Sequence, residues 1–483
     1  MEPCLLTTST ILAKTVKAGS HAGVRKALSC LLWLAIWQIA SMKVGSELLL
    51  ASPLATFTRL LQLVVEPRFW EVVGFSASRI IGGFLLAFLV AIVAGACAQR
   101  WRVVSDVLAL PVALLRSTPV VCIVVILLMW FGSRSVSVVS VFLMAFPAVY
   151  YSVREALTAV DKKVAEMLSV FDVGGLRRAL AQTWPEMLPF LIATSHSVCG
   201  MSWKAGVAAE LIGTPLGSIG ERIYQAKLLL ETGDVFSWTI AIVSFAALFE
   251  RLFVKLLKLS GKLTLALAVQ GCGRGTSLQV CRGAGIKLAD ASIGYPGKVV
   301  QQHLSICLPA TSRCCLVDPS GAGKTTFFRT VLGLQPLLAG NIGSCTDDRN
   351  MRMAAVFQEA RLIEAMDAYD NVVLAAGPAC DGSHAEVLLR GLLPAEALTV
   401  PVKQLSGGQR RRVELVRALA APCDLIVLDE PFAALDDTTR HNACNVLSRE
   451  LRGRTLLMSS HSKKDARLLH ASCMTLAAMQ HRG

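Results

Sequence analysis

The first half of the chain consists of long apolar runs separated by short polar segments. Six runs approach the roughly 20 residues that a helix needs to cross a hydrocarbon core. They lie at Leu28 to Met42, Ser76 to Ala98, Ala109 to Phe131, Val136 to Ser152, Pro189 to Ile212 and Val235 to Leu257. This pattern predicts an all-α polytopic membrane domain of about six transmembrane helices over residues 28–260, after an N-terminal segment at 1–27.

The second half has a different pattern, with short apolar runs suited to buried strands. Examples are Cys314 to Val317, Leu425 to Leu428 and Thr455 to Met458, and runs of this length are typical of a parallel sheet. A glycine-rich, unpatterned stretch at residues 261–285 separates the halves and is typical of a linker. The sequence therefore predicts a multi-domain chain whose residues 286–483 form an α/β domain.

Basic residues gather on one side of the predicted bundle. They precede the first run and recur near Arg100, between Arg154 and Arg178, and between Arg251 and Lys262. Because cytoplasmic loops carry an excess of Lys and Arg, we expect both termini in the cytoplasm. The first run follows basic residues as a secretory signal does, but no convincing cleavage site follows it, so we expect an uncleaved helix. The chain is then a multi-pass protein of the cell membrane.

The amino-acid composition argues against nucleic-acid binding and against a zinc or disulfide framework. Of the 483 residues 54% are hydrophobic, and the formal net charge is +14. No basic run is interleaved with aromatic residues, so the charge indicates cytoplasmic loops rather than nucleic-acid binding. The 15 cysteines include no C-x-x-C pair, which indicates reduced, mostly buried thiols rather than disulfides or a zinc site.

A phosphate-binding loop follows the run Cys314 to Val317. Glycines let backbone N–H groups approach an anion, a lysine pairs with the β- and γ-phosphates, and a hydroxyl suits magnesium. The residues that meet these needs, or flank them, are Ser320, Gly321, Gly323, Lys324, Thr325 and Thr326. We therefore expect ATP and Mg²⁺ as ligands.

Asp318 opens this loop where the strict pattern requires glycine. Two unit charges about 6 Å apart, at an effective dielectric constant near 20, repel by about 3 kcal/mol. The Asp318 carboxylate therefore either weakens ATP binding or points away from the phosphates. In the first case ATP hydrolysis would be impaired.

Further along lie Leu405-Ser406-Gly407-Gly408-Gln409 and then an acidic strand end, Asp429-Glu430. A serine and two glycines at a helix N-terminus offer N–H groups and a positive dipole to a phosphate. Alternation along the strand lets Asp429 face magnesium while Glu430 lies near the attacking water. In this order the motifs resemble those of the ABC transporter ATPases.

This resemblance implies roles for further residues. Tyr295, 29 positions before Lys324, would stack on adenine, and Gln358 would reach magnesium together with Thr325 and Asp429. Glu430 would be the general base, and His461 would contact the γ-phosphate. The signature residues would meet ATP held by the other subunit; they are Ser406, Gly407, Gly408 and Gln409.

The loop between the fourth and fifth runs resembles the EAA loop of binding-protein-dependent ABC importer permeases. Glu166 and Pro185 fit the family spacing, while Asp172 replaces a glycine; aspartate tolerates a left-handed conformation at a cost of about 1 kcal/mol. In the family this loop forms short helices that dock in a groove of the ATPase. The segments from Leu115 to Gly132 and from Trp203 to Gly213 are similar to nitrate/sulfonate/taurine-type permeases.

The resemblance also implies an assembly and a cargo. It implies an importer permease fused to its ATP-binding subunit, which drives uptake of a small anionic or zwitterionic solute with a separate extracytoplasmic solute-binding protein. Since one chain supplies one permease and one ATPase and two of each are needed, we expect a homodimer. An ABC exporter half-transporter shares this layout and remains one alternative; an ATPase-impaired, regulatory ABC transporter, which Asp318 would explain, is the other. Lys204, Glu210 and His196 either line an anion path or make structural pairs.

Overall fold

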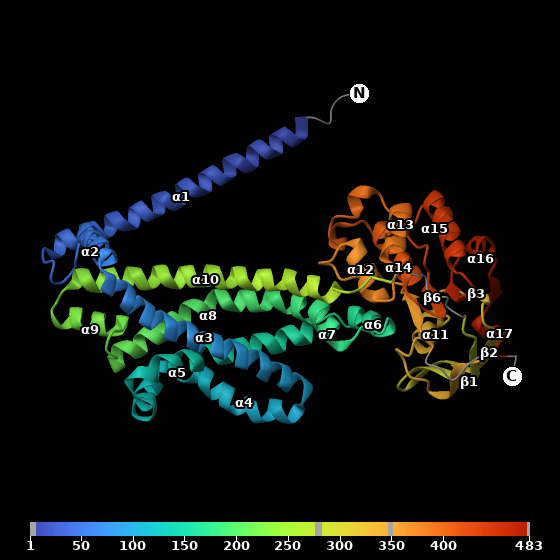
Figure 1. The fold of residues 1–483 in the computed structure, drawn as a ribbon, viewed down its shortest axis with the longest axis horizontal. Coiled ribbons are helices and arrows are strands. Elements are labelled where there is room, and N and C mark those ends of the chain that lie inside the picture. Colours follow the sequence, from blue (N-terminus) through green and yellow to red (C-terminus); the bar gives the residue numbers. More distant parts are fainter. Residues whose placement is uncertain (1–5, 276–282, 346–350, 481–483) are drawn as a thin grey trace. The chain divides into compact units, whose positions relative to one another are not determined.

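The computed structural model describes the chain except for residues 1–5, 276–282, 346–350 and 481–483 (Figure 1). The chain divides into two compact units. The first comprises Met1–Thr158 and Pro189–Leu257, and the second comprises Ala159–Leu188 and Lys258–Gly483. The short segment 159–188 therefore belongs to the same unit as the C-terminal half, although it lies between two long helices.

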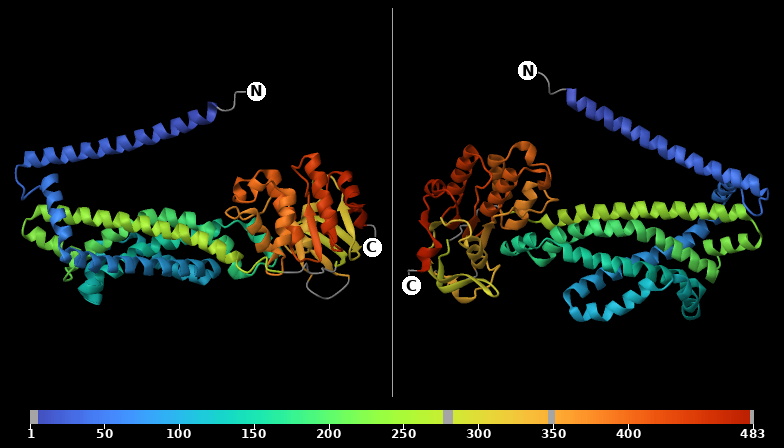
Figure 2. Two further views of the ribbon diagram at one scale, coloured as in Figure 1. Left: turned by 45° about the horizontal axis from the view of Figure 1, so that its top comes forward. Right: turned by 180° about the vertical axis from the view of Figure 1, so that it is seen from behind.

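In its described residues the first unit is helical (Figures 1 and 2). Its helices are α1 Leu6–Val44, α2 Pro53–Val65, α3 Pro67–Arg100, α4 Arg102–Ser117, α5 Val120–Ala159, α8 Trp184–Gly213, α9 Ile219–Leu228 and α10 Thr232–Val269. Three of these helices, α5, α8 and α10, extend into the second unit. Within the described chain, three segments are long and apolar enough to cross a membrane: Ala27–Val44, Pro67–Arg100 and Val121–Ala159. The predicted fifth and sixth runs lie in α8 and α10.

The third predicted run, 109–131, is not one helix. It begins in α4, breaks at Thr118, whose ψ is 128°, and resumes in α5. The reason is Pro119, because a proline disfavours the helical conformation of the residue before it. The boundary between the third and fourth runs lies at Gly132, where α5 kinks with φ 70° and ψ 170°.

Aromatic side chains pack α3 against α10. Phe84 is fully buried, and its ring centroid lies 5.2 Å from that of Phe249 and 4.9 Å from that of Phe253, both edge to face. Edge-to-face pairs at such distances add to the apolar burial. Outward-facing side chains are apolar as well: Leu31 and Trp33 of α1 are 63% and 67% exposed. Such a surface suits a lipid solvent.

The described residues of the second unit form two sheets. An antiparallel sheet has the order β2-β1-β4, with β1 Ile286–Tyr295, β2 Lys298–Leu308 and β4 Ala339–Ser344. A parallel sheet has the order β5-β6-β7-β3-β8, with β5 Met353–Val356, β6 Leu425–Asp429, β7 Thr455–Ser459, β3 Arg313–Leu316 and β8 Ser472–Met474. Every residue of β6 and β7 is buried, as the apolar runs predict for parallel strands.

Helices surround these sheets. They are α11 Lys324–Val331, α12 Ala368–Ala376, α13 Gly382–Leu392, α14 Gly407–Ala420, α15 Asp437–Glu450, α16 Lys463–Leu468 and α17 Leu476–Gln480, with 3₁₀ turns η2 Ala395–Ala397 and η3 Val402–Gln404. Helices α12, α13 and α14 pack on one another. The phosphate loop, Asp429 and His461 all follow carboxyl ends of parallel strands, where such sheets place their ligand sites.

The segment between α5 and α8 is mostly helical. It forms α6 Lys162–Val170, α7 Gly175–Arg178 and the π-helix η1 Ala179–Thr183. The predicted linker 261–285 is wrong at its start, because α10 continues to Val269. Ala268 is buried and Leu265 and Val269 pack against the same core, so apolar contacts hold this stretch helical. Residues 276–282 of the predicted linker lie outside the described residues.

Candidate nucleotide site and its link to the permease segment

The phosphate loop joins β3 to α11 and needs its glycines. Gly321 and Gly323 have φ of 85° and 97°, a region that glycine alone enters freely. A Cβ on Gly323 would also lie 2.6 Å from Val300 Cγ1. Lys324 is buried, and its Nζ donates to the carbonyl oxygens of Asp318 at 2.5 Å and Pro319 at 3.2 Å.

The Asp318 carboxylate turns away from this loop. Its Oδ2 and Oδ1 accept hydrogen bonds from the backbone N–H of Leu476 at 3.0 and 3.3 Å. Leu476 is the first residue of α17, so the carboxylate satisfies a donor that the helix itself leaves unpaired. Of the two sequence alternatives for Asp318, this geometry favours the one in which it points away.

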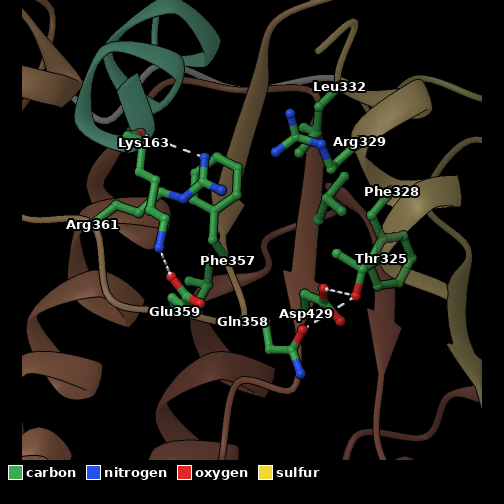
Figure 3. Close-up of a pocket in the computed structure, with 12 residues that line it drawn as sticks. Lys163, Thr325, Phe328, Arg329, Leu332, Phe357, Gln358, Glu359, Arg361 and Asp429 are labelled. Atoms are coloured by element: carbon green, nitrogen blue, oxygen red, sulfur yellow. Dashed lines mark hydrogen bonds and ion pairs between the residues drawn. The ribbon is translucent and has the colours of Figure 1, made fainter. Parts of the chain in front are cut away.

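Three oxygen-bearing side chains converge beside α11 (Figure 3). The Thr325 hydroxyl donates to Asp429 Oδ2 at 2.9 Å and to Gln358 Oε1 at 3.4 Å, and Ser459 Oγ donates to Asp429 Oδ1 at 2.7 Å. Burial raises the pKa of Asp429, while these hydroxyl donors oppose the shift. Hydroxyl, amide and carboxylate oxygens are the ligands that Mg²⁺ accepts, so this donor set fits the predicted ion. Among the described residues, no cluster of three or more His, Cys, Asp or Glu side chains offers a metal site.

Glu430 and His461 lie in hydrogen-bond contact. His461 Nε2 is 2.7 Å from Glu430 Oε1, and both line a cavity of about 270 Å³. Glu430 has φ 50°, and its N–H donates to Ser459 Oγ at 3.0 Å. A left-handed non-glycine residue costs about 1–3 kcal/mol and is concentrated at functional sites. The sequence assigned these two residues to one site, and the structure brings them together.

The signature forms the start of α14. Ser406 is the N-cap, its Oγ accepts from Gln409 N at 3.3 Å, and Gln409 Oε1 accepts from Ser406 N at 2.9 Å. Gly407 and Gly408 occupy the first turn. In the described part of the chain, no hydrogen bond joins residues 406–409 to residues 318–326. Tyr295 lies at the end of β1 and is 44% exposed, so its ring is accessible for stacking.

A buried charge cluster behind the signature was missed by sequence reasoning. Glu414 is fully buried, and its oxygens accept from Arg411 Nη1 at 3.1 Å, from Arg417 Nη2 at 3.5 Å and from Arg361 N at 2.8 Å. Desolvation lowers the pKa of the buried Arg417 guanidinium to about 10. The sequence did contain a signal, because Arg411, Glu414 and Arg417 follow one another at intervals of three residues on the helix. Charged side chains on a buried helix face have to pair with one another, since unpaired charges are not buried.

Arg411 connects this cluster to the end of strand β6. Its Nη2 donates to the carbonyl oxygens of Asp429 and Glu430, both at 2.6 Å, and its Nη1 donates to that of Phe357. The Arg411 guanidinium therefore binds both the backbone just before Gln358 and the backbone at Asp429 and Glu430. Residues of the signature helix, the strand end and the Gln358 loop are fixed relative to one another.

Segment 159–188 docks on the same unit through Glu166. Arg329 of α11 donates to both carboxylate oxygens, at 2.9 and 2.7 Å, and Arg361 Nη1 donates to Oε2 at 2.8 Å. These guanidiniums, Arg329 first, hold the pKa of Glu166 below its usual value despite partial burial. Lys163 pairs with Glu359, and its carbonyl accepts from Arg361 Nη1 at 3.4 Å (Figure 3). The predicted docking of Glu166 thus has named partners, which the sequence did not identify.

Apolar contacts complete this docking. Met167, Leu168 and Phe171 belong to the same buried core as the sheet residues, and the Arg417 guanidinium lies 5.1 Å from the centroid of the Phe171 ring. Asp172 has φ 51°, so it takes the left-handed conformation that the sequence anticipated for the residue replacing glycine. The turn after α6 is therefore preserved without glycine.

Two of the three candidate path residues make structural contacts. Glu210 is fully buried and accepts from Ser76 Oγ at 2.7 Å and Gly220 N at 3.5 Å. His196 Nδ1 lies 2.7 Å from Glu250 Oε1. For these two residues the structural alternative holds. Lys204 is exposed.

Comparison with known proteins identifies both halves. Residues 83–258 match the family of binding-protein-dependent transport system inner membrane components, and residues 301–433 match the ABC transporter family. The chain belongs to the ABC transporter family. It is a membrane protein in which an importer-type permease domain is fused to an ABC ATPase domain, as the sequence predicted.

Relatives of this ABC transporter include ATP-binding proteins for chemically different solutes. The aliphatic sulfonates import ATP-binding protein SsuB 1 of Pseudomonas fluorescens is 36% identical over 38% of this chain and 70% of its own length. The thiamine import ATP-binding protein ThiQ of Chelativorans is 32% identical over 41% of this chain and 87% of its own length. The manganese transport system ATP-binding protein MntB of Bacillus subtilis is 30% identical over 38% of this chain and 78% of its own length. These relatives share with the chain its ATP-binding domain.

Proposed function

We propose that the protein imports a small anionic or zwitterionic solute of the nitrate, sulfonate and taurine class across the cytoplasmic membrane, with its ATPase domain in the cytoplasm. The observation that carries import is the Glu166 contact with Arg329 and Arg361, because it joins an importer-type permease segment to the nucleotide site. Sulfonate import by the SsuB relative supports the solute class. A separate extracytoplasmic solute-binding protein delivers the solute.

In this proposal Lys324 and the loop N–H groups bind the phosphates of ATP, and Tyr295 stacks on the adenine. Ser320 and Thr326 flank this contact. Thr325, Gln358 and Asp429 would hold Mg²⁺, which supplies charge neutralisation of the phosphates. Glu430 accepts a proton from the attacking water, and His461, 2.7 Å away, orients that carboxylate and contacts the γ-phosphate.

The signature residues bind ATP held by a second copy, so the working assembly is a homodimer. The capping box of α14 engages the N–H groups of Ser406 and Gln409, and those of Gly407 and Gly408 in the first helical turn are the donors for that phosphate. One chain also provides one permease and one ATPase, and a two-fold assembly closes both sites with a single interface.

Uptake measurements test the proposed direction and cargo. The full chain, reconstituted in liposomes with its partner binding protein, should move taurine, an alkanesulfonate or nitrate from the binding-protein side to the ATPase side when ATP is added. Movement in the opposite direction, independent of the binding protein, would establish the exporter alternative instead.

A further inference from the structure

A cavity of about 640 Å³ lies within the first unit, between the end of α4, the second part of α5 and α8. Pockets for small molecules have volumes of about 300–1,000 Å³, so this one is large enough for a small solute. Its polar lining residues come from all three helices: Arg116 and Thr118, then Tyr151, Ser152 and Glu155, and then Thr194.

The cavity contains charges of both signs. Arg116 and Glu155 both line it, and within the described residues neither makes an ion pair. The Arg116 guanidinium carbon instead lies 5.6 Å from the centroid of the Tyr151 ring. A cation and an anion that share a cavity without pairing are both available to a ligand.

Arg116 lies in the last turn of α4, which ends at Ser117, and its guanidinium faces Tyr151 of α5. Tyr151 and Glu155 are four residues apart in α5, so they lie on the same face of that helix. This places Glu155 one helical turn from the residue that Arg116 contacts. Glu155 lies four residues before the end of α5 at Ala159, about 6 Å along the helix.

The remaining lining is mixed. Met144, Pro147 and Met201 supply apolar surface, which suits a short methylene chain. The Thr194 hydroxyl adds a donor for an oxyanion, whereas the Thr118 hydroxyl donates to the Leu114 carbonyl oxygen at 2.8 Å. A planar guanidinium offers paired donors to sulfonate or carboxylate oxygens. The combination fits a small molecule with an anionic head, a short carbon chain and a cationic end.

We infer that this cavity is a solute-binding station of the permease for a small zwitterion, whose anionic head is bound by Arg116 and whose ammonium group is bound by Glu155. The inference rests on the proposed import function and narrows its cargo. It involves other residues than the sequence-based candidates Lys204, Glu210 and His196, none of which lines this cavity.

Direct binding tests this without ATP or a binding protein. The full chain in lipid nanodiscs is titrated with taurine and with ethanesulfonate, which lacks the ammonium group. We expect wild type to bind taurine about tenfold more tightly, since one charge pair contributes on the order of 1.4 kcal/mol. Arg116→Gln should weaken both ligands tenfold or more, whereas Glu155→Gln should abolish only the preference for taurine.

Matched variants outside the cavity are Arg102→Gln and Glu71→Gln, which should bind both ligands as wild type does. Arg116→Lys keeps the charge and should recover part of the affinity, which separates loss of binding from loss of folding; monodisperse size-exclusion profiles provide a second check. Equal binding of taurine and ethanesulfonate, or no effect of Arg116→Gln, would overturn the inference. A failure of the import proposal would give a different result, because the solutes would then bind to the protein but would not be taken up.

Discussion

Arg329 holds Glu166 with both guanidinium nitrogens, at 2.9 and 2.7 Å, and so connects α11 directly to the permease segment α6. Helix α11 begins with Lys324 and Thr325 of the nucleotide site. A change at the phosphates therefore reaches Glu166 through six residues of this helix, Lys324 to Arg329. This is the mechanical link between ATP and the permease in our account.

Glu166→Gln should separate ATP hydrolysis from transport. The amide cannot pair with two guanidiniums, so we expect solute uptake to fall about tenfold or more, corresponding to at least about 1.4 kcal/mol of lost coupling, while ATPase activity without solute persists. Uptake and phosphate release are measured on the same liposomes. Glu396→Gln, at an exposed position of η2, is the control and should leave both unchanged.

The contribution of the Glu166 contact to stability should depend on pH. Because Arg329 and Arg361 lower the pKa of Glu166, its contribution to stability is fully present above the ordinary glutamate pKa of about 4.5 and is lost as pH falls through the lowered value. The difference in unfolding free energy between wild type and Glu166→Gln should therefore shrink below about pH 4.5. A difference that stays constant to lower pH would contradict the ionic contact.

Asp318 should matter for folding rather than for ATP binding. Its carboxylate accepts the Leu476 N–H, and loss of such a helix-end acceptor costs about 0.5–2 kcal/mol. Asp318→Gly should thus lower the unfolding free energy by roughly that amount and leave ATP affinity within about threefold. Asp318→Asn keeps an acceptor oxygen and should lose less stability. If Asp318→Gly instead tightened ATP binding tenfold, the carboxylate would act on the phosphates.

The fold was largely predictable because its patterns are local. Apolar runs identified the strands β3, β6 and β7, and the glycines, Lys324 and the acidic pair at Asp429 lie adjacent to them in sequence. Arg329 and Arg361 could not be predicted as partners of Glu166, since the contact joins residues more than 160 positions apart. The break before Pro119 was visible in the sequence, but the apolar run across it concealed the helix end.

Glu414→Ala should destabilise the ATPase domain strongly. It would leave Arg411 and Arg417 buried without their carboxylate, and breaking a buried ion pair from one side costs about 3–5 kcal/mol. Denaturant unfolding of the full chain, read by a signal from the ATPase domain, measures the change. Glu414→Gln retains an acceptor and should lose less. Equal stability of wild type and Glu414→Ala would show that this cluster is not structural.

Mixed dimers should report whether ATP sites are shared between two copies. Lys324→Ala disables phosphate binding and Ser406→Arg blocks the signature, so each homodimer should be inactive. Co-expression of the two with different tags places one intact site in each mixed dimer, and roughly a quarter of wild-type ATPase activity should return if pairing is random and the sites act independently. No recovery in purified mixed dimers would contradict a site completed by the second copy.

The central claim is that this one chain couples ATP hydrolysis to solute import. The most direct measurement is taurine transport by liposomes containing wild type or Glu430→Gln, with the binding protein on one side and Mg²⁺ and ATP on the other. Our account predicts transport toward the ATPase side for wild type and a loss of about 100-fold or more for Glu430→Gln, which retains ATP binding but lacks the base. Equal transport by both proteins, or transport by wild type without ATP, would contradict it.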